Sequence, residues 1–522
     1  MILSMSMTAF AAEAPKGTLT VNNTVEGKTL DLYQIFTATK NGDNVAYTLN
    51  SAYEGFFKNN TRIPGSESLT GEALSEKAYE YVKTQVGTDG KSGTGFAKEI
   101  LGWILENATT VATTHTTATT TAGSTVISGL EYGYYVVYPL GATDTSAAPG
   151  EQDYTSVASL VSVTGDTSIN MKSNYPTVVK KVNDKNADDV NIGDTVTYTL
   201  TSKVPDMTGY TSYVFNFKDT LSAGLTFKEI TSVKVGETTI TKVDAGQEAD
   251  NTYTLTQDGQ NITITMNNFL ASNKDNTGKE IKVTYTATLN KDAVTGFDAN
   301  KNSATVEYSN KPGTDNKGES EPSIVDVHTF NFTIFKYYLK DETKTGLAKA
   351  EFELYKANEA GDAADTNAKI NIVKVKDGEY RQATPEEAAA EGFKSDVIVS
   401  GTNGKVLVKG LDAGNYYLRE TKAPEGYNKL LSDIKVEIKA NYDETTGKLT
   451  SYSVDYTYNG KTTNGTAITN KDNSPEVAVE NKTGAQLPST GSKGALMVTL
   501  AGIVLFGALT ASKAFGKKKA KN

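Results

Sequence analysis

The sequence predicts a mainly β fold that is built from tandem β-sandwiches, with some helix in the first domain and an elongated chain. Threonine, valine and tyrosine are abundant, and there are 28 tyrosines among the 522 residues; these residue types fit strands. Apolar residues alternate with period two, as in Val196, Tyr198 and Leu200, which indicates half-buried strands. Short strands at this density, separated by turn signals, are typical of sandwiches.

The first folded segment is expected over residues 15–173. Its strands are predicted around Leu19 and Val21, over 134–138 and over 160–163. Between them, apolar residues at helical spacing predict helices over 68–86 and 96–107. A threonine-rich tract, 109–121, reads as a solvated loop or an exposed strand.

Two further segments follow, because a chain of 522 residues favours three or four domains. The second is predicted over 174–325 and the third over 326–484. Residues 310–322 are rich in Asn, Gly, Lys and Glu, and they form a plausible linker between the two.

Composition excludes several functions. The 52 basic and 62 acidic residues give a formal charge of −10, whereas a nucleic-acid surface needs a basic patch. The chain has no cysteine, so it cannot use disulfides. Its two histidines, His115 and His328, lack the spacing of metal ligands or of a catalytic triad. Both histidines are predicted to lie at the surface. No nucleophile–base pair or phosphate loop stands out, and we expect neither metal, nor cofactor, nor an enzyme acting on an external substrate.

The first 14 residues are predicted to be a secretory signal. Residues 1–12 are short and apolar, and Ala9-Phe10-Ala11 fits a small-residue cleavage site. No lysine or arginine precedes the apolar stretch, so the signal is expected to be truncated at its start. The mature protein would begin near residues 12–15.

Residues 485–522 carry a second targeting pattern. Leu487, Pro488, Ser489, Thr490 and Gly491 are followed by an apolar run, 495–511, and then by a lysine-rich tail. The run approaches the length of a membrane span, and the basic tail favours the cytoplasmic side. This order resembles the cell-wall sorting signal that sortases read. The resemblance implies cleavage between Thr490 and Gly491 and transfer of the threonyl group to an amine; the alternative is a simple membrane anchor with a chance motif.

Polar residues share inward faces with core residues in the third segment. Because strands alternate with period two, Lys336 continues the face of Phe332 and Ile334. Glu420 likewise continues the face of Tyr416 and Leu418, and Asn481 that of Val477 and Val479. Burying such groups without partners is costly.

The second segment repeats the order of lysine, acid and asparagine. Lys180 lies between Val178 and Val182, Asp219 follows Phe215 and Phe217, and Asn302 precedes Ala304 and Val306. Asn310 is the alternative to Asn302.

These segments resemble the immunoglobulin-like domains of Gram-positive pilins and collagen adhesins that form internal isopeptide bonds. The run from Tyr416 to Tyr427, YYLRETKAPEGY, is similar to the E-box of the B-type domain, and the resemblance gives Glu420 the catalytic role. The second segment is similar to the A-type domain, with Asp219 as the acid. The similarity lies in Val204-Pro205, in the run from Phe217 to Leu221 and in the run from Gly224 to Phe227. The resemblance implies that Lys180 joins Asn302 and that Lys336 joins Asn481. In the first segment Tyr138 stands at the acid position, and no such bond is predicted there.

The chemistry follows from burial. Desolvation lowers the pKa of a lysine and raises that of a carboxyl group, and only the neutral amine is a nucleophile. A protonated acid can polarise the asparagine carbonyl and pass protons to the leaving ammonia. Each bond forms once, without turnover.

The resemblance also implies polymerisation. Pilin subunits of this kind use a lysine shortly before the second domain, within a Tyr-Pro-Lys-Asn motif, but here Thr177 follows Tyr175-Pro176. Lys172 is the nearest candidate, and Lys181 is its alternative. The expected function is a shaft subunit of a covalent pilus, secreted, transiently held in the membrane and then anchored to the cell wall. The expected partners are sortase, identical subunits, peptidoglycan and, in addition, a host surface ligand. The alternative is a monomeric wall-anchored adhesin or a tip or base pilin.

Overall fold

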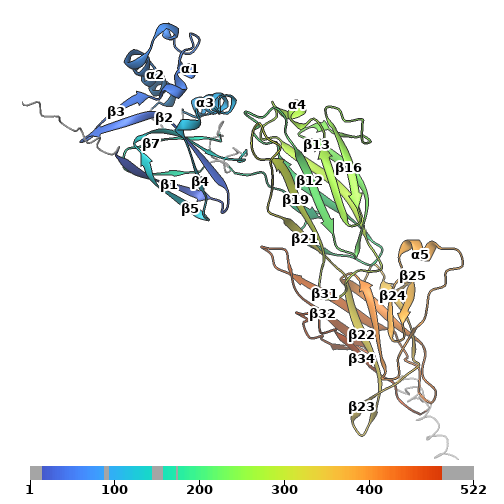
Figure 1. Ribbon diagram of the computed structural model, residues 1–522. Coiled ribbons are helices and arrows are strands. Elements are labelled where there is room, and N and C mark those ends of the chain that lie inside the picture. The colour runs from blue at the N-terminus through green and yellow to red at the C-terminus, as the bar shows by residue number, and fades with distance from the viewer. Residues whose placement is uncertain (1–14, 88–92, 144–156, 172–173, 485–522) are drawn as a thin grey trace, which may run out of the picture. The chain divides into compact units, whose positions relative to one another are not determined.

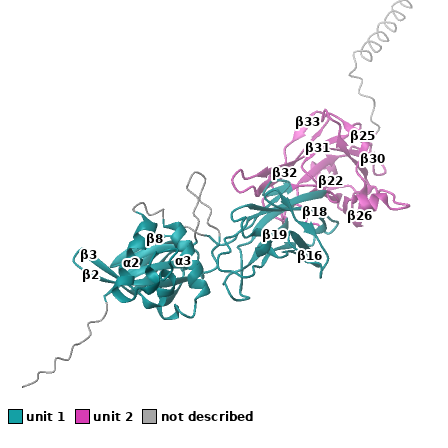
Figure 2. Cartoon of the chain, turned by 90° about the horizontal axis from the view of Figure 1, so that it is seen from above, with its two compact units in different colours: residues 1–188, 195–292, 300–327 teal, residues 189–194, 293–299, 328–522 magenta. Residues whose placement is uncertain are grey.

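The computed structural model describes residues 15–87, 93–143, 157–171 and 174–484. Strands dominate these residues, which confirms the mainly β prediction (Figure 1). The chain groups into two compact units, shown in teal and magenta in Figure 2. Residues 1–188, 195–292 and 300–327 form the first unit, and residues 189–194, 293–299 and 328–522 form the second. The predicted division into three segments stays a prediction.

The first segment contains two sheets. A three-stranded sheet has the order β5-β1-β8, and a second sheet has the order β3-β2-β6-β7, with β4 also paired to β2. The strands are β1 (Lys16–Thr24), β2 (Thr29–Asn41), β3 (Asn44–Leu49), β4 (His115–Thr119), β5 (Gly123–Glu131), β6 (Gly133–Pro139), β7 (Ser159–Val163) and β8 (Asp166–Asn170). Apolar residues of both sheets, including Leu19, Leu32 and Val137, form one core between them.

Helices cover the other face of the β2–β6 sheet (Figure 1). They are α1 (Glu54–Phe57), α2 (Gly71–Val86) and α3 (Thr94–Glu106), with 3₁₀ turns at Ser51–Tyr53, Ser66–Ser68 and Ala112–Thr114. Ile35 and Phe36 of β2 pack in one cluster with Leu74 and Ile100 of the helices. Strand β2 is therefore buried on both faces, and its burial does not alternate. This explains why period-two reasoning passed over it.

The middle segment is a sandwich of two sheets. One has the order β14-β13-β18-β11-β9, and the other β10-β21-β19-β12-β17-β16-β15, with β20 paired to β19. The first sheet contains β9 (Val179–Val182), β11 (Thr195–Lys203), β13 (Leu225–Val235), β14 (Thr238–Thr239) and β18 (Glu280–Leu289). The second contains β10 (Ala187–Asp189), β12 (Phe215–Leu221), β15 (Thr241–Lys242), β16 (Thr252–Asp258), β17 (Asn261–Met266), β19 (Asn300–Ser309), β20 (Lys317–Glu319) and β21 (Ser323–His328), with helix α4 (Phe269–Asn273) after β17.

The third segment is also a sandwich. Its sheets have the orders β23-β22-β29-β27-β26, with β34 paired to β22, and β25-β24-β30-β31-β32-β33, with β28 paired to β24. The first contains β22 (Phe330–Lys340), β23 (Thr343–Gly346), β26 (Ile372–Lys376), β27 (Glu379–Gln382), β29 (Lys405–Leu411) and β34 (Glu476–Glu480). The second contains β24 (Glu351–Ala357), β25 (Ala364–Lys369), β28 (Ile398–Val399), β30 (Gly414–Lys422), β31 (Ile434–Tyr442), β32 (Leu449–Tyr458) and β33 (Lys461–Thr463); helix α5 (Pro385–Ala389) lies between β27 and β28. Inward residues of both sheets, such as Phe332 and Leu418, share one core.

Several local predictions are tested by these elements. The two predicted helices are confirmed as α2 and α3, and the threonine-rich tract contains the exposed strand β4. The predicted linker 310–322 contains β20, which pairs with β19. The surface prediction for His328 is wrong, because this residue ends β21 and is 3 % exposed. Within the described ranges, no helix has the length and apolar character that a membrane crossing requires.

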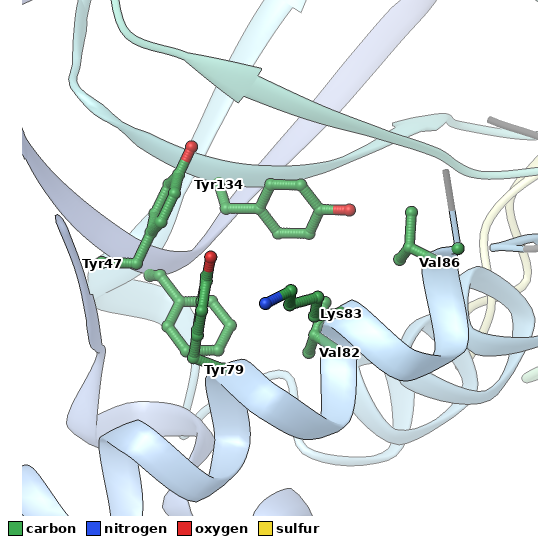
Figure 3. Close-up of a pocket in the computed structure, with 8 residues that line it drawn as sticks. Tyr47, Tyr79, Val82, Lys83, Val86 and Tyr134 are labelled. Carbon is green, nitrogen blue, oxygen red and sulfur yellow. The ribbon is translucent and has the colours of Figure 1, made fainter. Parts of the chain in front are cut away.

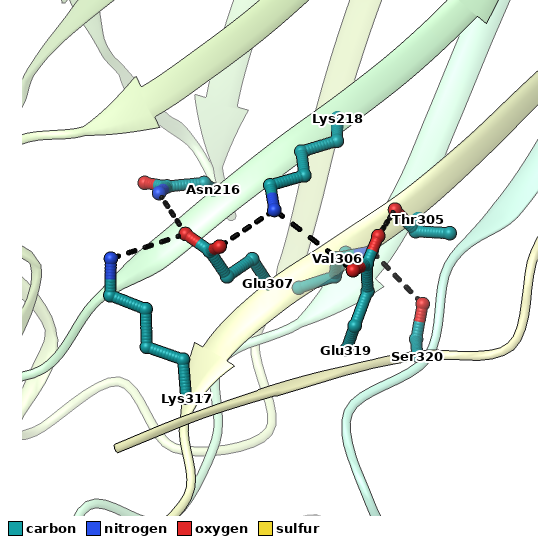
Figure 4. Close-up of polar contacts among 8 residues, drawn as sticks. All are labelled: Asn216, Lys218, Thr305, Val306, Glu307, Lys317, Glu319 and Ser320. Carbon is teal, nitrogen blue, oxygen red and sulfur yellow. Dashed lines mark hydrogen bonds and ion pairs between the residues drawn. The ribbon is translucent and has the colours of Figure 1, made fainter. Parts of the chain in front are cut away.

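The outer face of the middle sandwich carries a charge network (Figure 4). Lys218 of β12 contacts Glu307 of β19 at 2.6 Å (Nζ–Oε1), and Asn216 donates a hydrogen bond to the other oxygen of Glu307 at 2.9 Å. Lys317 and Glu319 of β20 extend the network. Asn216 and Lys218 alternate along β12 with the buried Phe217 and Asp219. The outer face of β12 therefore carries polar side chains, as is usual for a sandwich strand, while its inner face carries an acid.

Candidate functional site

Lys180 is buried in the middle sandwich. It lies on β9 opposite Leu200 of β11, and its neighbours Val178 and Val182 point to the same inner face. Only 1 % of its surface is exposed. The alternation of β9 therefore forces a cationic side chain into the core, as the sequence pattern predicts.

Asp219 and Asn302 reach the same place from the facing sheet. They lie on neighbouring strands, β12 and β19, where Asp219 is opposite Ala304 and Asn302 is opposite Leu221. Both side chains are buried. The fold thus brings together three polar residues that are separated by 39 positions or more.

The hydroxyl of Tyr285, on β18, lies at the centre of this set. Lys180 Nζ donates to Asp219 Oδ2 and, at 2.7 Å, to the Tyr285 hydroxyl. That hydroxyl donates to Asp219 Oδ2 at 2.8 Å and accepts from Asn302 Nδ2 at 2.7 Å. The rings of Tyr285 and Tyr198 stack at 5.1 Å, and Lys180 Nζ lies 4.9 Å from the centre of the Tyr198 ring.

The surroundings favour the neutral amine. Burial lowers the pKa of Lys180 to about 8, although Asp219 opposes this shift. Burial also raises the pKa of the Tyr285 hydroxyl well above its ordinary value, so the hydroxyl keeps its proton. Asp219 Oδ1 and Asn302 Oδ1 are buried and accept no hydrogen bond from the described residues. Such orphaned acceptors are costly in a finished core, and they leave the asparagine carbonyl free to react.

The third sandwich holds the second set in a different arrangement. Lys336 of β22 lies beside Val479 of the parallel strand β34, and Asn481 follows that strand. The backbone N–H of Asn481 donates to the carbonyl oxygen of Tyr337 at 2.9 Å. Glu420 comes from β30 in the facing sheet, opposite Phe352 of β24. All three polar side chains of the set are buried.

The contacts of this second set centre on the carboxylate. Lys336 Nζ lies 3.2 Å from Glu420 Oε1. Glu420 Oε2 accepts from the backbone N–H of Leu430 at 2.7 Å and from Asn481 Nδ2 at 3.3 Å. Asn481 Nδ2 also donates to the backbone carbonyl of Asn428. Burial lowers the pKa of Lys336 to about 8, again against the opposing effect of its acid.

Two family models match parts of the chain. Residues 192–312 match the Gram-positive pilin backbone subunit 2, Cna-B-like domain, and residues 333–453 match SpaA, a prealbumin-like fold domain. Two regions of the chain are thus similar to domains of Gram-positive pilus proteins. Both matched ranges include the acid of a buried set, Asp219 or Glu420.

Two pilus proteins are similar in sequence. The trypsin-resistant surface T6 protein of Streptococcus pyogenes serotype M6 is 26 % identical over 347 residues, which cover 60 % of this chain and 53 % of the relative. The type 2 fimbrial subunit of Actinomyces naeslundii is 29 % identical over 268 residues, 48 % of each chain. The chain thus spans about half the length of these relatives. Among solved structures, the T6 backbone pilin is similar, with a TM-score of 0.47 and 17 % identity, over 91 % of this chain and all of that one.

The first segment has no equivalent set among its described residues. Tyr138, which stands at the acid position, is buried on β6 opposite Asp31 of β2. His115 stacks on Tyr33, and its Nε2 lies 3.0 Å from Asp31 Oδ1. No lysine is buried within the described part of residues 15–171. The absence of an isopeptide bond there stays a prediction.

The structure describes only some of the other predicted site residues. Lys181 points away from Lys180, and its Nζ donates to Asn186 Oδ1 at 2.5 Å. Asn310 follows the end of β19 and is half-buried, whereas Asn302 contacts Tyr285. Lys172 and Leu487, Pro488, Ser489, Thr490 and Gly491 lie outside the described residues, as do the predicted signal and the apolar run.

A hollow beside helix α2 holds none of the predicted chemistry. Figure 3 shows Tyr47, Tyr79 and Tyr134 around it, with Lys83 as its charged member. The rings of Tyr47 and Tyr79 stack at 5.9 Å. The described residues also include no group of histidine and acidic side chains that could hold a metal. Among the described residues, the two lysine–acid–asparagine sets therefore remain the candidates for chemistry.

Sequence reasoning missed the partners that complete each set. The alternation along β18 marks Tyr285 only as an inward residue, although a buried tyrosine hydroxyl needs a polar partner. A tyrosine on the same inner face as a lysine was thus the available signal. The N–H of Leu430 and the carbonyl of Asn428 carried no signal, because backbone groups are the same at every position.

Proposed function

We propose that this chain is the shaft subunit of a covalently polymerised pilus, stabilised by the isopeptide bonds Lys180–Asn302 and Lys336–Asn481. Sortase would join subunits head to tail through Thr490 and a lysine, Lys172 or Lys181, and would finally attach the polymer to peptidoglycan. The protein would then be a structural component of the cell surface rather than an enzyme. A host surface ligand would be an additional partner of the finished fibre.

Each bond forms by the same balanced reaction. The neutral lysine Nζ attacks the side-chain carbonyl carbon of asparagine, so an N–C bond forms and the bond from that carbon to Nδ2 breaks. Nζ loses its proton, the departing nitrogen gains one, and ammonia leaves. The products are one secondary amide and one ammonia, and no oxidant or cofactor is needed. The acid, Asp219 or Glu420, accepts and returns the proton.

The observation that carries the proposal is the burial of two complete sets. Each lysine lies against a carboxylate, within a sandwich whose matched family is a pilin domain. A lone buried charge costs several kcal/mol, and a structural ion pair would not require an asparagine with an unpaired carbonyl in both sets. Enforced proximity of the amine and the amide supplies much of the rate.

Whole-protein mass spectrometry with peptide mapping tests the bonds. The chain is expected to weigh less than its sequence by two ammonia molecules, with Lys180 joined to Asn302 and Lys336 to Asn481. An unmodified mass would overturn the isopeptide assignments. Peptides that join Lys180 to Asn310 instead would correct the middle pair.

Polymerisation needs a separate experiment. The full chain is expressed with a pilus sortase in a Gram-positive host, and cell-wall extracts are examined for a covalent ladder. Lys172→Ala is expected to abolish the ladder, and Lys181→Ala serves as the matched variant; the reverse outcome would identify Lys181. A ladder that survives both changes would leave neither lysine as the acceptor, and monomers alone in the wild type would support the adhesin alternative.

A further inference from the structure

The two sets connect the lysine, the acid and the asparagine through different groups. Glu420 contacts both reactants, because one oxygen lies 3.2 Å from Lys336 Nζ and the other accepts from Asn481 Nδ2. Asp219 is one methylene shorter. It contacts Lys180, but no hydrogen bond joins it to Asn302 among the described residues, and its Oδ1 has no partner.

The Tyr285 hydroxyl spans this gap. It is the group that bonds Lys180 Nζ, Asp219 Oδ2 and Asn302 Nδ2 together. Its strand, β18, belongs to the sheet of the lysine, while Asp219 and Asn302 belong to the facing sheet. Stacking on Tyr198 and complete burial hold the ring in place. In the third sandwich, no tyrosine hydroxyl bonds Lys336, Glu420 or Asn481 in the described contacts.

We infer that Tyr285 is a catalytic proton relay for the Lys180–Asn302 bond, and that it carries to the leaving nitrogen the proton that Asp219 takes from the lysine. The inference rests on the proposed isopeptide reaction and adds a residue to it.

The relay balances at each atom. As Lys180 Nζ bonds to the side-chain carbon of Asn302, Nζ gives its proton to Asp219 Oδ2. Tyr285 donates its hydroxyl proton to Nδ2, and the bond between that nitrogen and carbon breaks. The protonated Asp219 then returns its proton to the Tyr285 oxygen across the 2.8 Å contact. Ammonia leaves, and both Asp219 and Tyr285 end in their starting states.

Tyr285→Phe in the full chain tests the relay. It removes one oxygen and keeps the ring. Since general acid–base catalysis contributes on the order of 10²-fold or more, Lys180–Asn302 is expected to form roughly 100-fold more slowly. The cross-linked fraction is followed by intact mass and peptide mapping in freshly purified protein. Lys336–Asn481 forms in the same molecules and reports that the chain folded.

Tyr308→Phe is the matched control. Tyr308 is a buried tyrosine on β19, the strand of Asn302, and its hydroxyl makes no described hydrogen bond to Lys180, Asp219 or Asn302. Both bonds should form fully in this variant. A Tyr285→Phe chain that completes Lys180–Asn302 as fast as the wild type would overturn the relay. A wild-type chain without that bond would instead overturn the proposed function.

A second substitution separates chemistry from packing. Replacing Tyr285 with 3-fluorotyrosine keeps the hydroxyl and nearly the same shape but makes the hydroxyl more acidic. If Tyr285 relays a proton, the more acidic hydroxyl should change both the rate at which Lys180–Asn302 forms and the dependence of that rate on pH. An unchanged profile in the fluorinated protein would show that the hydroxyl only fills space, even if Tyr285→Phe disturbs the fold.

Discussion

At the scale of single residues, the two sandwiches contain groups that ordinary cores exclude. Lys180 and Lys336 are almost completely buried, each beside one carboxylate. Removing one partner of such a pair leaves an unpaired charge, which costs about 3–5 kcal/mol. The proposed covalent bond, which consumes the amine, would remove this cost permanently. The chemistry and the stability of each sandwich would then depend on the same three side chains.

Glu420→Gln is expected to prevent or strongly slow the Lys336–Asn481 bond, by roughly 10²-fold or more, while Lys180–Asn302 still forms. Glutamine keeps the shape of the side chain but cannot take a proton from Nζ. Peptide mapping measures both bonds in one sample. Glu353→Gln is the control, because Glu353 lies on β24 and its Oε1 pairs with Lys369 at 2.6 Å, away from the set. Complete Lys336–Asn481 linkage in Glu420→Gln would contradict the role of the acid.

The depressed pKa of Lys180 predicts how stability depends on pH when the bond cannot form. Burial lowers the pKa of Lys180 to about 8 in the native fold, and Asn302→Ala is expected to keep this lowered pKa, whereas an unfolded lysine titrates near 10.4. Between these values the unfolded state binds more protons. The free energy of unfolding should therefore rise with pH, by up to about 1.4 kcal/mol per pH unit.

Urea unfolding between about pH 7 and about pH 9.5 measures this slope. The matched variant is Asn302→Ala with Lys180→Met, which lacks the titrating amine and should have the flatter profile. Equal slopes in the two variants would show that the lysine is not depressed in the folded state.

At the scale of elements, the two proposed bonds would restrain their strands differently. Lys180–Asn302 would join β9 to β19 across the two sheets of a sandwich. Lys336–Asn481 would join β22 to the end of β34, which is its parallel neighbour in one sheet. Strand β34 has five residues and pairs only with β22 among the described strands. It is therefore an edge strand, and its attachment depends strongly on the bond.

Asn481→Ala should loosen β34 selectively. Hydrogen exchange is expected to accelerate at the amides of β34 and at its partner positions on β22, while β30 and β31 keep most of their protection. The lost cross-link closes a loop of more than 100 residues, for which chain entropy predicts a loss of roughly 5 kcal/mol. Asn473→Ala, in the exposed turn before β34, is the control. Unchanged exchange in β34 would show that its hydrogen bonds suffice.

At the scale of the whole molecule, each compact unit contains one set. Lys180, Asp219 and Asn302 lie in the first unit, and Lys336, Glu420 and Asn481 lie in the second. Each proposed bond would therefore close a chain loop within its own unit. A chain without disulfides would thereby gain a covalent restraint in both units.

Calorimetry should resolve this independence. Asn302→Ala is expected to lower the melting temperature of one transition and Asn481→Ala that of the other, each by roughly 10 °C, since about 1 kcal/mol shifts a domain of this size by 2–4 °C. The double variant should show both shifts, because distant sites are additive. A single substitution that shifts both transitions equally would mean that the units unfold as one.

Local sequence alone determined which side chains point inward. The period of two along β9, β12, β22 and β30 placed Lys180, Asp219, Lys336 and Glu420 in register with apolar neighbours, and the pleat of a strand fixes that alternation without any distant contact. The tertiary structure decided which inward residues meet. It placed the Tyr285 hydroxyl in contact with Lys180, Asp219 and Asn302, and it placed the backbone N–H of Leu430 against Glu420. It also buried both faces of β2 and buried His328, which local pattern had assigned to the surface. Strand pairing and sheet packing bring together positions that are far apart in the chain. The local sequence around each position does not show which distant residue it will contact.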